Sequence, residues 1–337
     1  MIAPINKRVL LARMVGQRAF DPFIRRCSAW NGLLVLNYHR VGDPNGTLFD
    51  WELWSASEES FDAQMSYLAQ NYDIVGPDDL EEIRRGQRGR HVMITFDDGY
   101  RDNYELAFPI LKQHHTTATF FLTTGYLDHP SLAWWDEIAW MVRTSDRTGI
   151  DRAPWLSSEM TFDEPDRCRA IHQLLSIYKQ LPHDETEQFL DSLADATGTG
   201  RAPVNLARDQ WMTWEMAREM HREGMSLGGH TVSHPVLARH EPARQEQEIS
   251  QCKQRIEDQI GASISVFAYP VGSRTAFDRQ TQSLLSKHGF EAAFSFYGGY
   301  NSWDDWSPYD LRRVPIEQAT TLAEFRALLS TPQVFAR

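Results

Sequence analysis

The chain alternates between short apolar runs and longer amphipathic stretches. The apolar runs are rich in β-branched and aromatic residues and predict buried strands at residues 33–38, 73–75, 91–96, 117–123, 225–228, 264–269, 292–296 and 311–316. The stretches between them predict helices at about 58–72, 77–85, 103–114, 213–222, 241–260, 276–288 and 322–329. About eight strand–helix repeats indicate an α/β fold, with a parallel barrel as the first interpretation and a wound sheet as the second. The opposite charges in the helix at 241–260 predict a solvated face.

Two segments depart from this alternation. Residues 131–207 are mostly helical and polar, with no convincing strand, and are interpreted as a helical insertion in a barrel domain at 31–337. Residues 1–30 form a basic arm whose first 26 residues carry six Lys or Arg against one acid, Asp21. Its apolar residues predict an amphipathic helix that either packs on the domain or lies on a membrane surface, and they are Val9, Leu10, Met14 and Phe20.

Composition excludes several classes of protein. With 337 residues, 42% of them hydrophobic and 24% charged, the chain has the make-up of a globular protein. A formal net charge of −12 argues against a general nucleic-acid binder, because such a protein needs a basic surface. Three scattered cysteines indicate neither disulfides nor a cysteine metal site. Without a long apolar segment or signal sequence, the expected location is the cytoplasm, with the arm offering contact with the inner face of the membrane.

Candidate chemistry begins at the end of the strand 91–96. Asp97 and Asp98 follow it directly, and Gly99 permits a sharp exit of the chain, so both carboxylates are expected at the edge of the sheet where α/β proteins place their sites. A simple Asp-Asp-Gly turn is the alternative. His39 follows the strand at 33–38 in the same way and is a second candidate, although a structural histidine is the competing interpretation.

The stretch SLGGHTVSHP at 226–235 supplies candidate metal ligands. It places His230 and His234 four residues apart, just after a predicted strand. Two imidazoles and one carboxylate leave a divalent ion with open positions for water and substrate, as hydrolytic sites require. Asp98 is the expected third ligand, which leaves Asp97 free to act as a base.

These stretches resemble known motifs. TFDDG at 95–99, HTVSH at 230–234 and FAYPVG at 267–272 are similar to the first three motifs of the polysaccharide deacetylase family, the NodB-homology group or carbohydrate esterase family four. The resemblance covers about residues 33–316 apart from the insertion. It implies a distorted parallel (β/α) barrel of about seven strands, Asp97 as base, and Asp98, His230 and His234 as metal ligands. The implied reaction is hydrolysis of an acetyl group on a sugar.

The sequence departs from the family pattern at two positions. The third motif ordinarily contains an arginine that pairs with the base, but Ala268 stands there, so Arg313, and Arg312 second, is expected to replace it. Strand alternation turns Arg313 toward the barrel interior. No histidine for protonating the leaving amine occurs after His288. His39 is expected to take this role, as in the permuted poly-N-acetylglucosamine deacetylases that the chain resembles here.

The substrate and cofactor follow from the same resemblance. The expected substrate is an N-acetylated carbohydrate bound by Tyr269, Pro270, Val271 and Trp303, with the Val271 N–H as a second oxyanion donor. The expected cofactor is a divalent ion, Zn²⁺ first, with Co²⁺, Ni²⁺, Fe²⁺ or Mn²⁺ also suited to oxygen and imidazole ligands. A hydrolase of another C–N or O-acyl bond and an inactive glycan-binding protein are the alternative functions.

Overall fold

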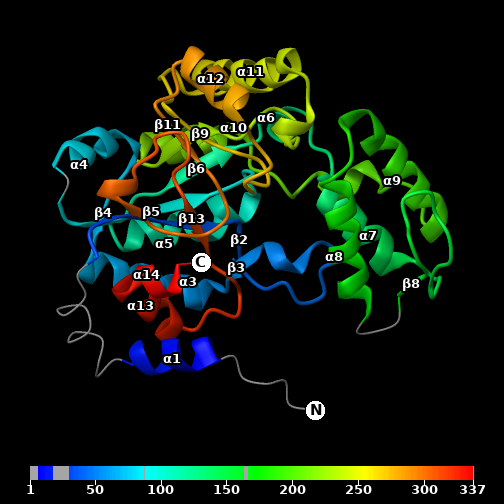
Figure 1. The fold of residues 1–337 in the computed structure, drawn as a ribbon, viewed down its shortest axis with the longest axis horizontal. Coiled ribbons are helices and arrows are strands. Elements are labelled where there is room, and N and C mark those ends of the chain that lie inside the picture. Colours follow the sequence, from blue (N-terminus) through cyan, green and yellow to red (C-terminus); the bar gives the residue numbers. More distant parts are fainter. Residues whose placement is uncertain (1–6, 18–29, 87, 163–165, 337) are drawn as a thin grey trace.

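Seven parallel strands curl into a barrel at the centre of the molecule (Figure 1). The structure is a computed structural model that describes residues 7–17, 30–86, 88–162 and 166–336. The barrel strands are β1 (Gly32–Tyr38), β5 (Arg90–Phe96), β6 (Thr119–Leu122), β9 (Ser226–Gly229), β10 (Val266–Ala268), β11 (Ala292–Phe294) and β13 (Arg313–Pro315). Their order is β11-β10-β9-β6-β5-β1, and β13 pairs with the other side of β1. A bridge between Phe294 and Leu311 joins β11 to the chain that enters β13. The predicted distorted barrel of about seven strands is confirmed.

Short strands lie around the ends of the barrel. β4 (Asp73–Ile74) runs parallel to the beginning of β5, and β12 (Asn301–Ser302) runs antiparallel to the beginning of β1. β2 (Arg40–Val41) and β3 (Trp54–Ala56) pair with each other. Of these four short strands only β4 was predicted.

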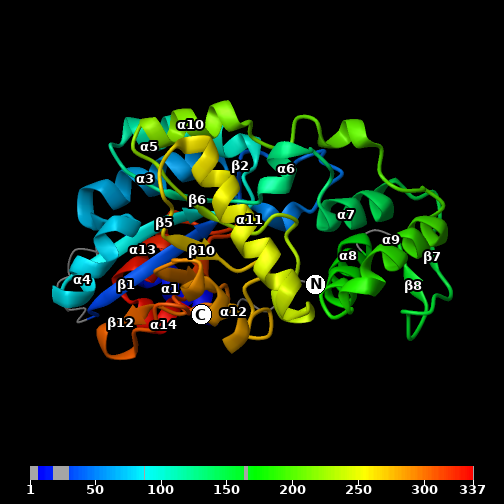
Figure 2. The same ribbon diagram turned by 90° about the horizontal axis from the view of Figure 1, so that it is seen from above.

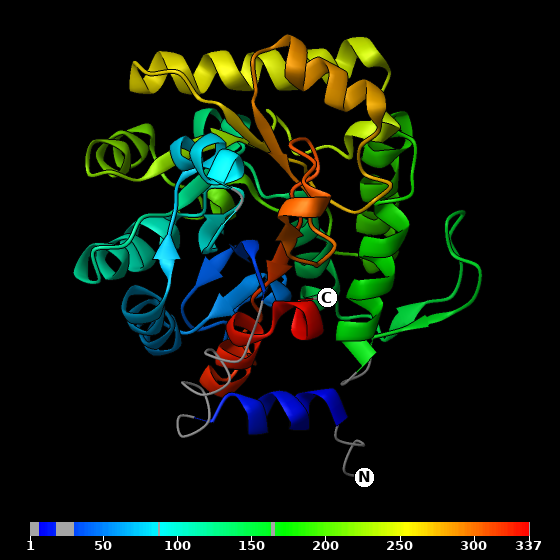
Figure 3. The same cartoon turned by 60° about the vertical axis from the view of Figure 1, so that its left-hand side comes forward.

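Helices surround the barrel (Figure 3). They are α3 (Glu58–Asn71), α4 (Leu80–Gly86), α5 (Phe108–Gln113), α6 (Thr124–Asp128), α10 (Trp214–Arg222), α11 (Pro242–Ile260), α12 (Arg279–Lys287), α13 (Leu322–Ser330) and α14 (Pro332–Phe335). A π-helical turn, η3 (Asn103–Ala107), precedes α5. Side-chain caps begin several of them, since Ser57, Asp278 and Thr321 each accept a hydrogen bond from a backbone N–H three residues later.

The basic arm includes helix α1 (Lys7–Val15), which packs on α13. Ala12 is buried, a side chain at Gly16 would collide with the backbone of Ala323, and Arg13 lies 3.3 Å from Glu324. Leu11 and Met14 remain 48% and 61% exposed. Phe20 and the rest of the apolar stripe beyond residue 17 lie outside the described residues. No helix in the described part of the chain is long and apolar enough to cross a membrane.

The insertion lies beside the barrel as a separate group of helices (Figures 1 and 2). It contains α7 (Trp134–Thr144), α8 (Asp166–Tyr178) and α9 (His183–Thr197), which share an apolar cluster with Tyr100 and Tyr126 of the barrel. The expectation that it holds no strand was wrong, because β7 (Gly149–Ile150) and β8 (Met160–Thr161) form a short antiparallel pair. Two-residue strands leave no alternation for sequence analysis to detect.

Asp136 on α7 fastens the insertion to the barrel. Its carboxylate accepts hydrogen bonds from the backbone N–H of Asp50 at 3.0 Å and from the hydroxyl of Tyr100 at 3.2 Å. The indole N–H of Trp135 donates to the same hydroxyl at 2.7 Å. Burial raises the pKa of the Asp136 carboxyl to about 7, although the positive charge of Arg40 opposes that shift. The carboxyl group of Asp136 therefore fixes the position of the loop at Asp50 relative to the chain that follows β5.

We expect Asp136 to give the protein a distinctive pH dependence of stability. An aspartate in an unfolded chain ionises near pH 3.9, so between about pH 4 and pH 7 the folded protein holds a proton that the unfolded chain has lost. The free energy of unfolding should therefore fall as the pH rises through this window, relative to that of an Asp136→Asn variant. Urea midpoints at several pH values measure the difference. Asp184→Asn, at the exposed start of α9, is the control, and parallel profiles for wild type and Asp136→Asn would contradict the assignment.

Candidate active site

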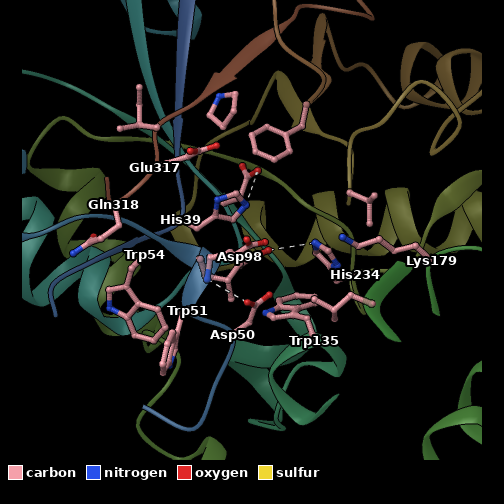
Figure 4. Close-up of a pocket in the computed structure, with 18 of the residues that line it drawn as sticks. His39, Asp50, Trp51, Trp54, Asp98, Trp135, Lys179, His234, Glu317 and Gln318 are labelled. Carbon is pink, nitrogen blue, oxygen red and sulfur yellow. Dashed lines mark hydrogen bonds and ion pairs between the residues drawn. The ribbon is translucent and has the colours of Figure 1, made fainter. Parts of the chain in front are cut away.

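A cavity of about 570 Å³ opens at the carboxyl edge of the barrel strands (Figure 4). The expected site residues meet there because each follows the end of a strand: His39 after β1, Asp97 and Asp98 after β5, and His230 after β9. His234 lines the same cavity. The strand ends thus bring together residues that are almost 200 positions apart in the sequence.

Asp98, His230 and His234 form a compact set of metal-ligating atoms. The Oδ1 of Asp98 lies 3.4 Å from the Nε2 of His230 and 3.3 Å from the Nε2 of His234. Ligands bound at about 2.1 Å in a tetrahedron are separated by about 3.4 Å, so the spacing fits one ion. This oxygen is buried and has no hydrogen-bond partner among the described residues. An uncompensated buried carboxylate oxygen is expensive, and a cation at this point would satisfy it.

The neighbouring contacts prepare His230 for metal binding. Its Nδ1 donates a hydrogen bond to the carbonyl of Ala268 at 2.8 Å, so Nε2 is the nitrogen that faces Asp98 and carries the lone pair in the neutral ring. Burial lowers the pKa of His230, but the charge of Asp97 and the contact with Asp98 outweigh burial and raise it. Burial lowers the pKa of His234 to about 3, so its imidazole is neutral. Ala268 stands where the family motif ordinarily has an arginine, and it contributes to the site through its backbone carbonyl.

Backbone strain is concentrated at this site. Five non-glycine residues in the described ranges have positive φ, and four of them lie here: Asp98 (74°), Thr231 (69°), His234 (55°) and Val271 (62°). Left-handed backbone is unfavourable for residues with a Cβ, and such strain persists only where the surroundings enforce it. The two loops that carry the candidate ligands are therefore held in shape by contacts from elsewhere.

Glu248 on α11 supplies such contacts. Its carboxylate accepts hydrogen bonds from the backbone N–H groups of Val232 and Ser233 at 2.8 and 2.9 Å, and from the Ser233 hydroxyl at 2.7 Å. Arg244 donates to Oε1 of this carboxylate, the oxygen that also accepts the Ser233 hydroxyl, at 2.7 Å. The expectation that the charges of this helix form a solvated face is therefore wrong at Glu248, which is buried because it binds the loop between the two histidines.

Asp97 faces the barrel interior and is paired with Arg313. The guanidinium donates from Nη1 to Oδ1 at 2.7 Å and from Nη2 to Oδ2 at 2.8 Å. Burial raises the pKa of the Asp97 carboxyl, but the charge and hydrogen bonds of Arg313 outweigh burial and hold it well below its usual range. Asn37 donates to the same carboxylate at 3.3 Å. Arg312, the second choice, instead binds Asp305.

His39 lies beside this carboxylate. Its Nε2 is 3.9 Å from Oδ2 of Asp97, and its ring meets Phe296 edge-on with 5.5 Å between the ring centres. The backbone is held on both sides, because the His39 N–H donates to Ser55 and the His39 carbonyl accepts from Asn103 at 2.7 Å. The imidazole therefore reaches the cavity from a fixed backbone position.

The residues expected to bind substrate divide into two groups. Tyr269 and Val271 line the cavity, and Pro270 between them is buried. Trp303 does not belong to the site. It follows β12 at the amino ends of β1 and β5, and its ring lies 6.0 Å from that of His91. Since β5 has seven residues at about 3.3 Å each, Trp303 lies at the opposite end of the barrel from Asp97. The expectation for Trp303 is therefore corrected.

Several residues of the site gave no sequence signal. Asn37 and Thr95 sit opposite each other on β1 and β5 and hydrogen-bond to each other at 2.8 Å, yet each is one polar residue in an apolar run. Glu248 is one charge among many on α11. Asp50 and Lys179 line the cavity from a loop and from the insertion, where no motif marks them. Alternation within a strand could have identified only Asn37 and Thr95.

The family model for polysaccharide deacetylases matches residues 84–148 and 157–293, which include Asp97, Asp98, His230 and His234. YxkH of Bacillus subtilis, a candidate polysaccharide deacetylase, is 21% identical over 303 residues, or 89% of this chain and 76% of that protein. A poly-β-1,6-N-acetyl-D-glucosamine N-deacetylase of Staphylococcus epidermidis is 33% identical over 110 residues, which are 29% of this chain and 38% of that enzyme.

A solved structure shares the fold. The deacetylase PplD of Streptococcus pyogenes, solved in complex with acetate, superimposes with a TM-score of 0.57 at 17% identity and covers 88% of this chain and 96% of that one. The arrangement of strands and helices is therefore similar to that of the PplD barrel.

We expect Glu248→Gln to weaken metal binding although Glu248 is not a candidate ligand. The glutamine amide lacks the negative charge that binds the N–H groups of Val232 and Ser233. Substitution of a residue that supports metal ligands without binding the metal typically lowers metal affinity roughly 10-fold to 100-fold. Competition with a chelator measures this affinity. Glu246→Gln on the same helix, which changes only surface contacts with Lys287 and His288, is the matched control. Equal affinities for the two variants would show that Glu248 does not hold the loop.

Proposed function

Because the chain belongs to the polysaccharide deacetylase family, we propose that it removes N-acetyl groups from a carbohydrate by metal-dependent hydrolysis. The observation that carries this proposal is the pair of adjacent aspartates in different surroundings. Asp98 converges with two imidazoles, while Asp97 is bound to a guanidinium and faces the same cavity. Neighbouring carboxylates with separate partners can perform separate tasks, one as a ligand and one as a base.

Asp98, His230 and His234 would hold the divalent ion. Their spacing, the unsatisfied Asp98 oxygen and the tautomer of His230 all suit such a ligand set. When bound, the ion acidifies a water molecule and polarises the acyl oxygen. Zinc is the first candidate, with Co²⁺, Ni²⁺, Fe²⁺ and Mn²⁺ as alternatives for a site of one oxygen and two nitrogen ligands.

Asp97 would take the proton of the attacking water. The ion pair with Arg313 keeps its carboxylate ionised near neutral pH, so it is able to accept a proton. An ionised carboxylate is a weak base, so its contribution rests on its ionised state and its fixed position rather than on high basicity. Asn37 and Arg313 also fix the carboxylate in orientation, so that reaction requires no rearrangement of the base.

His39 would protonate the departing amine. An amine leaves a tetrahedral intermediate readily only when it receives a proton, and an imidazole is the side chain best suited to donate one near neutral pH. The Nε2 of His39 lies 3.9 Å from Oδ2 of Asp97. The group that would accept the proton of water and the group that would donate a proton to the amine nitrogen are therefore neighbours in the cavity. Val271, with its left-handed backbone in the cavity, would present its N–H to the oxyanion, and Tyr269 lies next to it.

The named substrate of the staphylococcal relative is a polymer of N-acetylglucosamine, and we propose an N-acetylated saccharide of this kind for the present chain. Hydrolysis of another C–N or O-acyl bond is the alternative, because the same groups could act on it. The inactive glycan-binding alternative is disfavoured, because no binding role requires a base, an acid and three converging metal ligands together.

We also propose weak peripheral contact of the arm at residues 1–26 with an anionic membrane surface, which would place the enzyme at the inner face of the membrane. Leu11 and Met14 on α1 are exposed although the helix is anchored on α13, and the arm is rich in Lys and Arg. Such a pattern favours the interface between lipid and water.

We expect Asp97→Asn and Asp98→Asn to lose activity in different ways. Asp98→Asn removes an anionic ligand, so metal content and acetate release from N-acetylated oligosaccharides should fall together and recover in part at high metal concentration. Asp97→Asn should keep its ion but lose on the order of 10²-fold to 10⁴-fold in rate, without rescue by added metal. His39→Ala should also keep its ion and be less damaging for an ester substrate, whose leaving group depends less on a proton.

The measurements are metal content of each purified variant and acetate release with and without added divalent ions. Loss of metal from Asp97→Asn and retention by Asp98→Asn would reverse the two roles. Absence of acetate release by the metal-loaded wild type from any N-acetylated saccharide would reject the proposed reaction and leave the alternative acyl substrates.

For the arm, we expect salt-sensitive binding to vesicles that contain anionic lipid and none to neutral vesicles, because charge attraction is screened within about 10 Å at 0.1 M salt. Flotation of wild type and of a Leu11→Ser, Met14→Ser variant measures this binding. Equal flotation of the two proteins would show that the exposed residues of α1 do not contribute.

A further inference from the structure

Lys179, which follows α8 in the insertion, projects its ammonium group into the cavity toward His234 (Figure 4). Within the part of the chain that the structure describes, this group has no hydrogen-bond or ion-pair partner. Burial lowers the pKa of Lys179, while the charges of Asp50 and Glu52 oppose that shift. Burying an ammonium group without a hydrogen-bond acceptor is costly, so a ligand that supplies an acceptor would stabilise it.

Aromatic rings flank this ammonium group. It lies 5.9 Å from the ring of Trp134, which is fixed by stacking on Tyr178 with 4.2 Å between the ring centres. Trp51 is 43% exposed and lines the cavity on another side. The guanidinium of Arg143 covers one face of that indole at 3.9 Å, and the indole N–H donates to the carbonyl of Thr47. Trp51 is therefore held as a rigid apolar surface.

A carboxylate faces the same cavity. Asp50 accepts the N–H of Glu52 and so caps η1 (Trp51–Leu53), while its own N–H is bound by Asp136. Asp50 thus stands at a fixed point in the cavity that Lys179 also lines (Figure 4). An anionic ligand would gain from Lys179 but would be repelled by Asp50 and Glu52. A neutral ligand rich in hydroxyl groups satisfies both signs of charge.

We propose that Lys179, Asp50 and Trp51 form a second saccharide subsite, which binds the sugar ring next to the one that loses its acetyl group. Lys179 donates to ring oxygens, Asp50 accepts from ring hydroxyls, and the indole of Trp51 covers an apolar ring face. The substrate is accordingly an oligosaccharide or polymer of at least two sugar units, and sugar nucleotides and monosaccharides are poor ligands. The assignment of the reacting ring rests on the proposed function, whereas the binding of the second ring does not.

Binding can be measured without turnover in the metal-loaded Asp97→Asn protein. Titration calorimetry with N-acetylglucosamine, its disaccharide, its tetrasaccharide and a nucleotide diphosphate-linked N-acetylglucosamine gives the contribution of each added group. A hydrogen bond from a charged donor should make the disaccharide bind roughly 10-fold to 100-fold more tightly than the monosaccharide. Adding Lys179→Met, which keeps the length of the side chain, should remove most of this ratio. Trp51→Ala should reduce it as well.

Two matched controls separate local effects from general ones. Lys112→Met removes an ammonium that is paired with Glu223 on the outside of the barrel, and Trp306→Ala removes an indole that stacks on Trp303 at the opposite end of the barrel. Both should leave the ratio of affinities unchanged.

Three outcomes would overturn the subsite. In the first, the second sugar ring adds no affinity. In the second, Lys179→Met lowers the affinities for the monosaccharide and the disaccharide by the same factor. In the third, the nucleotide-linked sugar binds most tightly and its binding depends on Lys179. The last result would identify an anion site instead. Acetate release by the wild type on the same ligands is scored separately. Its absence together with a Lys179-dependent chain-length effect would reject the deacetylase function and keep the subsite.

Discussion

The ion pair between Asp97 and Arg313 is the contact on which both the barrel and its chemistry depend. Arg313 is fully buried, and a lone buried charge would cost several kcal/mol. The guanidinium satisfies its donors with both oxygens of Asp97, with Asn37 and with the carbonyl of Ser295. Asn37 lies in β1, Asp97 directly follows β5 and Ser295 directly follows β11, so the residue that keeps the candidate base ionised also ties β13 to the other strands. Removing one partner of such a pair typically costs about 3–5 kcal/mol.

The candidate metal site depends on a second constraint, the left-handed backbone of its loops. Asp98 and His234 both have positive φ, which places their side chains where extended backbone could not. Gly228 and Gly229 precede the histidine loop, and a side chain at either would press against Phe121 or Phe267, so β9 lies unusually close to its neighbours. The carboxylate of Glu248 then fixes the loop by binding two of its N–H groups. Tight strand packing and one buried carboxylate together stabilise a conformation that the loop would not adopt alone.

The barrel could be predicted from the sequence because most of its strands lie in largely apolar runs bounded by polar residues, the pattern of strands buried on both faces. The residues that follow these runs could be assigned to the carboxyl edge of the strands, where α/β proteins place their sites. The strand at 311–316 was predicted, but the way it closes the barrel was harder to foresee, since β13 has three residues and the link at Leu311 is a single bridge. Trp303 was misplaced because a loop tryptophan carries no information about which end of a barrel it occupies. Lys179, Asp50 and Glu248 depend on contacts between distant segments, which no local pattern encodes.

The cavity has two kinds of wall, and they differ in how they are held. The reacting end is built on strand termini, whose positions are fixed by the hydrogen bonds of the barrel, so its geometry cannot change without changing the fold. The outer wall comes from the loop at Asp50 and from the insertion, which has an apolar cluster largely of its own. The polar network that includes Asp136 and Trp135 couples this wall to Tyr100, directly after the aspartate motif. Residues that we propose to contact the rest of a substrate can therefore vary in the insertion while the groups that we propose to perform hydrolysis stay in place.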